Sequence, residues 1–171
     1  MQSDQSYYGV TEDNSKHFDA QTWDKRYIAV SELMQLGKSV IDLCGGDGKL
    51  QFYIQISKYQ CVDITKRCAN AIVADFNKKE FPYFAEKFDY ATCLGGLEYL
   101  DDVLGFLQFL RNYSNTIIVT YNNIVKKSPV FKNAYTQFEI QNLLNKAGWE
   151  IQEIESYGKE KVYLCKNIYI N

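Results

Sequence analysis

The sequence predicts an α/β fold, a three-layer sandwich with a mostly parallel seven-stranded sheet and a C-terminal antiparallel hairpin. Short apolar runs rich in β-branched residues alternate with stretches of helical spacing. The runs are apolar on both faces, which is typical of parallel strands covered by helices on both sides. The last two runs flank a glycine without an intervening helix, as expected for a hairpin.

Length and composition predict one globular domain over residues 1–171. A chain of 171 residues suffices for one core, and 46% hydrophobic with 23% charged residues is an ordinary globular balance. Lys plus Arg number 19 against 21 Asp plus Glu, whereas nucleic-acid binders usually need a basic face. No run reaches the roughly 18 apolar residues of a membrane span, and the start lacks signal-peptide character. We therefore expect a cytoplasmic protein with no nucleic-acid and no membrane partner.

The cysteines do not predict a metal site. There are five of them and a single histidine, and no two cysteines have CxxC spacing. We expect reduced, mostly buried thiols, at positions Cys44, Cys61, Cys68, Cys93 and Cys165.

The elements are predicted in chain order, beginning with a polar, aromatic-bearing arm over the first 20 residues. A helix is expected over 24–36, ended by Gly37. Together, residues 1–37 are expected to form an arm and helix that serve as a lid over the core of residues 38–171. The apolar runs predict parallel strands at 39–43, 59–64, 71–74, 88–94 and 116–121.

Helices are expected between and after these strands. Apolar residues at helical spacing predict one over 101–113, opened by an aspartate cap. A capping box, Thr136-x-x-Glu139, opens another, which Gly148 ends. The stretch 49–57 alternates like a strand, but a parallel strand on each side requires a crossover, so a helix is expected there. The hairpin is expected over 149–154 and 161–170, around Gly158.

The most informative motif is the run 39–48, Ser-Val-Ile-Asp-Leu-Cys-Gly-Gly-Asp-Gly, in which a strand enters a glycine-rich turn. Gly45, Gly46 and Gly48 let the backbone turn sharply and let a ligand approach closely. Asp42 would place a fixed negative charge beside that ligand.

Three kinds of ligand compete for this turn. A P-loop needs Gly-Lys-Ser/Thr, and here Lys49 is followed by Leu50. A dinucleotide motif would need glycine in place of Gln51, and Asp42 and Asp47 would repel its pyrophosphate. A cationic ligand without a phosphate suits the acidic residues best.

With these residues the sequence resembles the class I S-adenosylmethionine-dependent methyltransferases, whose first motif is Asp/Glu-x-Gly-x-Gly-x-Gly. Here the motif is Asp42-Leu-Cys-Gly-Gly46-Asp-Gly48, with Cys44 in place of the first glycine. Strand two ends at Asp63, 21 residues after Asp42, where the family holds the ribose hydroxyls. Strand four leads into Leu-Glu-Tyr99, similar to the family's Leu-Glu-His.

The resemblance covers about residues 38–170 and implies S-adenosylmethionine as cofactor and S-adenosylhomocysteine as product. In the family, an aspartate such as Asp75 accepts a hydrogen bond from the adenine, and an apolar neighbour such as Phe76 lies on the ring. The cofactor-binding residues implied are Asp42, Cys44, Gly45, Gly46, Gly48, Asp63, Ile64, Asp75, Phe76, Leu94 and Gly95.

Structural roles are the alternatives for the same residues. Asp42 suits a helix cap, while Asp63 and Asp75 suit ordinary turns after strands. Phe76 suits the core equally well, and Glu98 and Tyr99 suit a turn-shaping role.

The acceptor is expected to be a small molecule, such as a sugar or another metabolite, methylated on oxygen or nitrogen. Enzymes that methylate base amines typically carry Asp/Asn-Pro-Pro-Tyr/Phe after strand four, where this chain has Leu-Gly-Gly. The candidate catalytic residues are His17, Glu98 and Tyr99, and the candidate substrate contacts are Tyr7, Tyr8, Asn122 and Asn123. The alternatives are a non-catalytic cofactor-binding or partner-binding module and, with less support from the motif, a nucleotide-dependent oxidoreductase.

Overall fold

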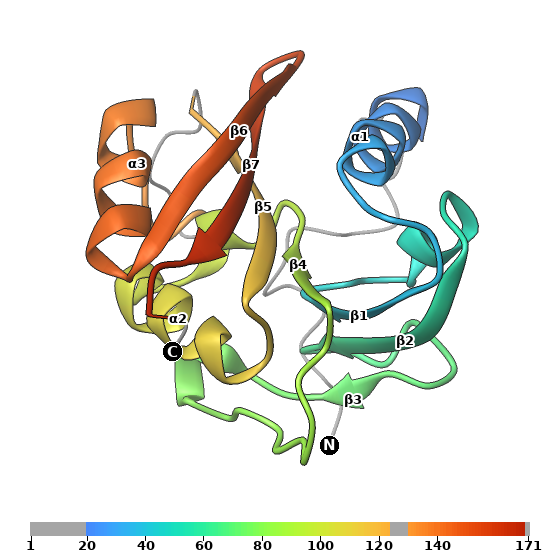
Figure 1. Cartoon of the computed structure of the whole chain (residues 1–171). Coiled ribbons are helices and arrows are strands. Elements are labelled where there is room, and N and C mark those ends of the chain that lie inside the picture. Colours follow the sequence, from blue (N-terminus) through green and yellow to red (C-terminus); the bar gives the residue numbers. More distant parts are fainter. Residues whose placement is uncertain (1–19, 124–129, 170–171) are drawn as a thin grey trace.

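The computed structural model describes residues 20–123 and 130–169, which form one seven-stranded sheet with helices on both faces (Figure 1). The strands are β1 (Lys38–Leu43), β2 (Ile56–Asp63), β3 (Ile72–Val73), β4 (Tyr90–Cys93), β5 (Thr116–Asn122), β6 (Trp149–Tyr157) and β7 (Glu160–Asn167). The α-helices are α1 (Ala20–Glu32), α2 (Val103–Phe109) and α3 (Gln137–Lys146). Single 3₁₀ turns form η3 (Lys49–Phe52), η4 (Phe76–Lys78), η5 (Leu97–Tyr99) and η6 (Leu110–Asn112).

The sheet is mixed, as the sequence predicts. Its strand order is β3-β2-β1-β4-β5-β7-β6. The first five strands in this order pair in parallel, and β7 pairs antiparallel with both β5 and β6. The predicted C-terminal hairpin is therefore confirmed, and it extends the parallel sheet at one edge.

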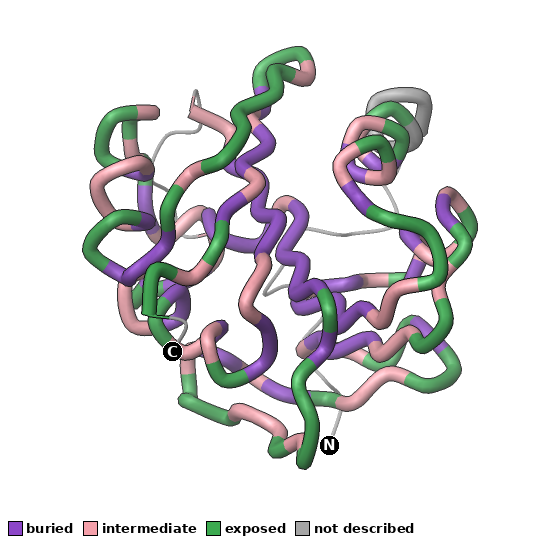
Figure 2. The backbone as a smooth tube through the Cα atoms, in the orientation of Figure 1, coloured by how far each residue is buried: buried purple, intermediate pink, exposed green. Residues whose placement is uncertain are grey.

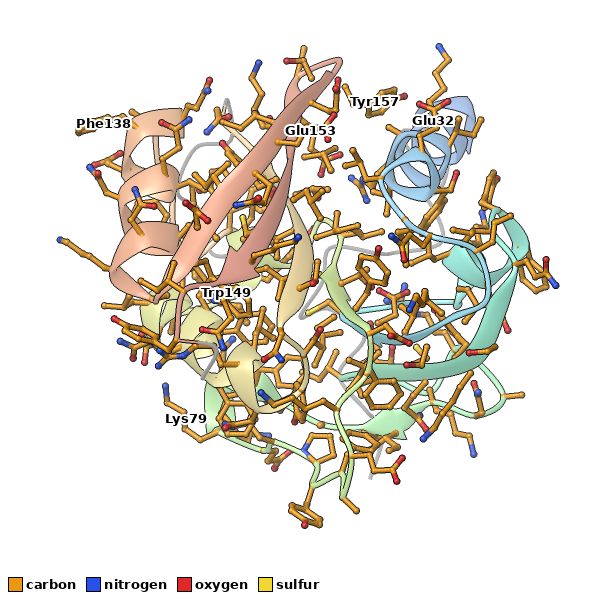
Figure 3. All side chains as sticks on the ribbon, viewed as in Figure 1. Glu32, Lys79, Phe138, Trp149, Glu153 and Tyr157 are labelled. Carbon is orange, nitrogen blue, oxygen red and sulfur yellow. The ribbon has the colours of Figure 1, made fainter. Side chains whose placement is uncertain are left out.

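One face of the sheet is covered by α2 and α3. Ile41 and Leu43 of β1 point to this side, together with apolar residues of β4, β5 and β7. The indole N–H of Trp149 donates to the carbonyl of Leu107 at 2.8 Å and so fastens β6 to α2 (Figure 3). The resulting cluster is the larger of two apolar cores, which Figure 2 shows as buried backbone along the central strands.

The other face is covered by α1 and η3. Val40 of β1 and Leu94 after β4 contact Tyr27, Val30 and neighbouring apolar residues. Helices thus cover both sides of the sheet, which confirms the three-layer α/β architecture. The alternation of side chains along a strand explains why consecutive residues of β1 serve different cores.

The helix predicted over 49–57 is wrong. Only η3 forms, and the chain already enters β2 at Ile56. Leu50 and Ile54 are buried while Phe52 is exposed, so the apolar side chains at these three positions do not share one face as they would in a strand. A single 3₁₀ turn is enough to cross from β1 to β2, because those strands are neighbours in the sheet.

Two other helices have different bounds from those predicted. The first spans Ala20–Glu32 instead of 24–36, because after Val30 the backbone bonds tighten to i−3 and the chain turns away. The second begins at Val103, where Asp102 accepts from the Gly105 N–H at 2.8 Å, and its last turn becomes η6. The predicted capping box of Thr136 and Glu139 is confirmed.

The described residues include neither the predicted arm nor a helix or side-chain cluster suited to a membrane span or a metal site. His17, Tyr7, Tyr8 and the rest of the predicted arm lie outside the described residues. Over 20–123 and 130–169, no helix is long and apolar enough to cross a membrane. Within the same ranges, no three His, Cys, Asp or Glu side chains gather in a way that could hold a metal ion.

Candidate active site

The candidate site lies where the five parallel strands end. Their carboxyl ends meet at one edge of the sheet, and the strand order reverses between β1 and β4. Open α/β sheets bind ligands at such a switch point. The glycine-rich turn follows β1 at this place, and the loop with Gly95 and Gly96 follows β4.

The glycine-rich turn has the backbone shape that its sequence predicts. Gly46 and Gly48 have φ values of 57° and 75°, and Cys44 has 58° although it is not a glycine. A positive φ in such a residue costs roughly 1 kcal/mol. A methyl group on Gly45 would lie 2.9 Å from both the Asp42 carbonyl oxygen and Cys61 Sγ. The turn therefore has no room for a side chain at 45.

Asp42 lies under this turn and is almost fully buried. Its Oδ2 accepts from the Tyr59 hydroxyl at 2.6 Å, and its Oδ1 accepts from the Thr92 hydroxyl at 2.7 Å. Burial raises the pKa of Asp42 to about 6, although the two hydroxyl bonds oppose the shift. Both carboxylate oxygens thus have partners within the chain, and contact of Asp42 with a cofactor stays a prediction.

Asp63 ties the end of β2 to the same turn. Its Oδ2 accepts from the Gly46 N–H at 2.9 Å, and its Oδ1 accepts from the N–H and hydroxyl of Thr65 at 3.0 and 3.1 Å. Arg67 lies 3.4 Å from Oδ1, and Ile64 is half-buried beside it. The structure therefore brings Asp63 to the glycine-rich turn, and its contact with a ribose stays a prediction.

Asp75 and Phe76 follow β3 and have structural contacts. Asp75 caps η4 by accepting from the Asn77 N–H at 3.0 Å, and Lys78 lies 3.3 Å from its other oxygen. Phe76 is buried, with its ring 5.1 Å from that of Phe106 in the larger core. These contacts match the structural alternatives given for both residues, and their adenine contacts stay a prediction.

A chain of hydrogen bonds runs from the end of β4 to α1. The Gly95 N–H donates to the Thr120 hydroxyl at 2.8 Å, which donates to Glu160 Oε1 at 2.7 Å. Arg26 Nε donates to Glu160 Oε2 at 2.6 Å, and a methyl group on Gly95 would lie 2.8 Å from the Arg26 guanidinium. Leu94 is buried in the smaller core.

Sequence reasoning missed Arg26 and Glu160. The sequence contained one signal for Arg26. This residue stands next to Tyr27 and four residues before Val30, so it borders the apolar face of the helix. Its partner is 134 residues away, however, and such a pairing is decided by the strand order rather than by local spacing.

Glu98 is buried, and one of its two carboxylate oxygens has no hydrogen-bond partner among the described residues. Its Oε1 accepts from the Asn122 N–H at 2.7 Å, whereas Oε2 has no hydrogen-bond partner among the described residues. Burial raises the pKa of Glu98 to about 7, and the Asn122 N–H opposes the shift. Both amide atoms of Asn123 are likewise buried and without a partner there. Since buried polar atoms are normally paired, these atoms are candidates for contacting a ligand.

Tyr99 follows Glu98 at the same edge. Its ring is 5.3 Å from that of Phe131, and burial raises the pKa of its hydroxyl. The structure therefore brings together Glu98, Tyr99, Asn122 and Asn123 from among the predicted site residues.

The arrangement fits S-adenosylmethionine. In the turn between β1 and β2, Gly46 is half-buried, whereas Gly45 and Gly48 are buried. A methyl group on Gly48 would lie 2.9 Å from Cys68 Sγ, so this position has no room for a side chain. Asp42 and Asp63 surround this turn with negative charge, which suits a cation and disfavours a phosphate.

Comparison with known proteins supports this fit. Residues 15–154 match the family described as a methyltransferase domain. A curated ubiquinone/menaquinone biosynthesis C-methyltransferase of Francisella tularensis is 28% identical over 99 residues, or 58% of this chain. The match spans only about a third of that relative's length, 36%.

Two solved structures share the fold. A Burkholderia thailandensis 1,6-didemethyltoxoflavin-N1-methyltransferase, with its substrate and S-adenosylhomocysteine bound, has a TM-score of 0.73 at 13% identity, covering 95% of this chain and 84% of that chain. A Haloferax volcanii chain solved in complex with the Trm112 methyltransferase activator has a TM-score of 0.72 at 12% identity, covering 94% of both chains. With the family match, the fold and the acidic glycine-rich turn, the chain belongs to the class I S-adenosylmethionine-dependent methyltransferases.

Proposed function

We propose that this methyltransferase acts on a small-molecule acceptor, a sugar or another metabolite, at the carboxyl ends of β4 and β5. The observation that carries the proposal is the Glu98 carboxylate, buried at this edge with Oε2 unpaired among the described residues. In the proposed reaction Glu98 accepts the proton of an acceptor hydroxyl or amine, and Asn122 and Asn123 contact the acceptor.

The cofactor supplies an electrophilic methyl group on a positively charged sulfur. The chain would hold it with the glycine-rich turn and Asp63, helped by Asp42, Ile64 and Asp75. The remaining predicted contacts are Cys44, Phe76, Leu94 and Gly95, and residues 1–37 are proposed to cover the site as a lid. The chain's main task is to orient the acceptor and to exclude water.

The environment of Glu98 suits proton transfer near neutral pH. With a pKa of about 7, a substantial fraction of the side chain is a carboxylate at that pH. The Asn122 N–H holds Oε1, so Oε2 keeps a defined position. Burial raises the pKa of the Tyr99 hydroxyl, and the nearby charge of Glu98 raises it further. The Tyr99 hydroxyl therefore shares the environment of Glu98.

The names of the similar proteins support a small acceptor. One acts in ubiquinone/menaquinone biosynthesis, and another binds didemethyltoxoflavin. The near-neutral charge balance of this chain agrees, because nucleic-acid substrates usually need a basic surface.

A second candidate is a methyltransferase that works with a protein activator. The Haloferax structure favours it, since that chain was solved with an activator and is matched over 94% of its length. Co-purification and light scattering of this chain with candidate activators would decide between an autonomous and an assisted enzyme.

Cofactor binding is tested first, by calorimetry with S-adenosylhomocysteine. Asp63→Asn should weaken binding by about tenfold to a hundredfold, because a charged acceptor of hydrogen bonds is removed. Asp89→Asn is the matched control, since Asp89 is exposed at the opposite ends of β1 and β4. Equal binding by both variants would contradict the assignment of Asp63.

The role of Glu98 is tested by the pH dependence of methyl transfer to a panel of hydroxyl and amine metabolites. The rate should rise with pH through about 7, as the carboxyl loses its proton. Glu98→Gln retains an oxygen for the Asn122 N–H and should lower kcat by about a hundredfold or more. Its affinity for S-adenosylhomocysteine should stay that of the wild type. An unchanged kcat in this variant would refute Glu98 as proton acceptor. Product binding without turnover of any metabolite would favour the non-catalytic alternative.

A further inference from the structure

Two cysteines meet at the candidate active site. Cys44 lies in the glycine-rich turn after β1, and Cys93 is the last residue of β4. In the register of these parallel strands, Leu43 is directly opposite Cys93. Neighbouring strands are about 4.8 Å apart, so the residue after Leu43 is within the range of backbone separations that a disulfide spans.

Gly96 shows that the two sulfurs converge. A methyl group built on Gly96 would lie 2.7 Å from Cys44 Sγ and 2.9 Å from Cys93 Sγ. Both sulfurs therefore approach the same point from different strands. The missing side chain at Gly96 leaves the space that they occupy, and the nearby Cys44 thiol together with burial raises the pKa of Cys93.

The backbone at Cys44 is a second, independent observation. Its φ of 58° is a conformation that favours glycine, and a cysteine occurs there instead. This substitution places a thiol beside Cys93. Cys44 is half-buried, whereas Cys93 is fully buried, so a small reagent in solution reaches Cys44 first.

We propose that Cys44 and Cys93 are a modification site, a dithiol that closes to a disulfide on reaction with a hydroperoxide. The Cys44 thiol attacks the peroxide, giving a sulfenic acid at Cys44 and an alcohol or water. The Cys93 sulfur then attacks the Cys44 sulfur, forming the S–S bond, and the sulfenic oxygen leaves as water with the thiol proton. Both thiols are oxidised, and one peroxide is reduced.

The disulfide joins the glycine-rich turn to the end of β4. A sulfur–sulfur bond is about 2.05 Å long, shorter than any contact between two thiols, so its closure draws the turn towards β4. The crevice between the carboxyl ends of β1 and β4 narrows as a result. Weaker S-adenosylhomocysteine binding should follow, and this consequence, unlike the cross-link itself, rests on the proposed function.

The other thiols make internal controls. Cys61 and Cys68 also lie close enough together to raise the pKa of Cys61, but both are buried. Cys165 is fully buried in the larger core. None of these three is even partly exposed as Cys44 is, and the reaction with a peroxide needs a first thiol that solvent reaches.

The experiment treats the protein with hydrogen peroxide in modest excess and maps cysteine peptides by mass spectrometry, with and without a reducing agent. We expect one linked peptide pair containing Cys44 and Cys93, lost on reduction, in wild type and in Cys165→Ala. Cys44→Gly, which restores the glycine favoured at positive φ, should form no such link. A link between Cys61 and Cys68 only, or Cys44 oxidised while Cys93 stays a free thiol, would overturn the proposal.

Calorimetry separates this proposal from the proposed function. Reduced protein should bind S-adenosylhomocysteine, and the cross-linked protein should bind it at least tenfold more weakly. If the reduced protein does not bind, the proposed cofactor site fails while the mapped disulfide still stands. If cross-linked and reduced proteins bind equally, the inferred narrowing of the crevice is wrong.

Discussion

At the scale of single residues, Asp42 shows how a buried carboxyl group makes the stability of the fold depend on pH. Two hydroxyls hold its oxygens, yet burial raises its pKa from 3.8 to about 6. The folded state therefore binds this proton more tightly than the unfolded chain does. The stabilisation that protonated Asp42 gives to the folded state is complete below about pH 4 and is lost as the pH rises through about 6.

Asp42→Asn should remove this pH dependence. A shift of about two pKa units corresponds to roughly 3 kcal/mol, so the wild type should lose stability relative to the variant between pH 4 and pH 7. Thermal unfolding of both proteins across this range measures the difference. Parallel curves for the two proteins would show that Asp42 is not the group that titrates.

At the scale of elements, α1 is fastened beside the active-site edge by Arg26. Arg26 pairs with Glu160 of β7, and both side chains are mostly buried. Tyr27 stacks on Tyr53 with ring centroids 5.3 Å apart, and Tyr157, near the tip of the hairpin, packs against the same core (Figure 3). The helix is therefore held both by apolar contact and by one buried ion pair.

Arg26→Met should destabilise the protein by roughly 3–5 kcal/mol, because it leaves Glu160 buried without its ion-pair partner. The double variant Arg26→Met with Glu160→Gln should recover most of that loss, since no buried charge remains. Urea unfolding of the single and double variants gives the coupling energy. Simple additivity of the two changes would rule out a direct interaction between the two side chains.

At the scale of the whole molecule, the two apolar cores share one sheet. Val40 belongs to the core beneath α1, while its neighbour Ile41 belongs to the core beneath α2 and α3. Loss of the helices on one face would expose apolar residues of strands that also carry the core on the opposite face. Both layers of helices should therefore unfold together.

Cooperative unfolding is tested with Trp23→Phe, which leaves Trp149 as the only tryptophan. Trp149 fluorescence reports on the larger core, and far-UV circular dichroism also reports on α1. The two urea transitions should coincide. An earlier loss of helical signal would mean that α1 detaches before the sheet unfolds.

Local rules in the sequence determined the strands, the glycine-rich turn and the helix caps. The cap at Thr136 and the turn at Gly46 depend on groups only a few residues apart, so spacing alone predicted them. The same spacing failed at 49–57, because a helix and a 3₁₀ turn make equally good crossovers and only the position of β2 decides between them.

Tertiary structure alone decided which distant groups meet at the site. The pairing of Asp42 with Thr92, the ion pair of Arg26 with Glu160 and the convergence of Cys44 with Cys93 all join residues far apart in the chain. Strand order and register set these contacts, and burial then sets the pKa values of Asp42 and Glu98. The sequence by itself determined a methyltransferase-like turn and its acidic residues. Their partners and proton affinities depend on long-range packing, which no local pattern encodes.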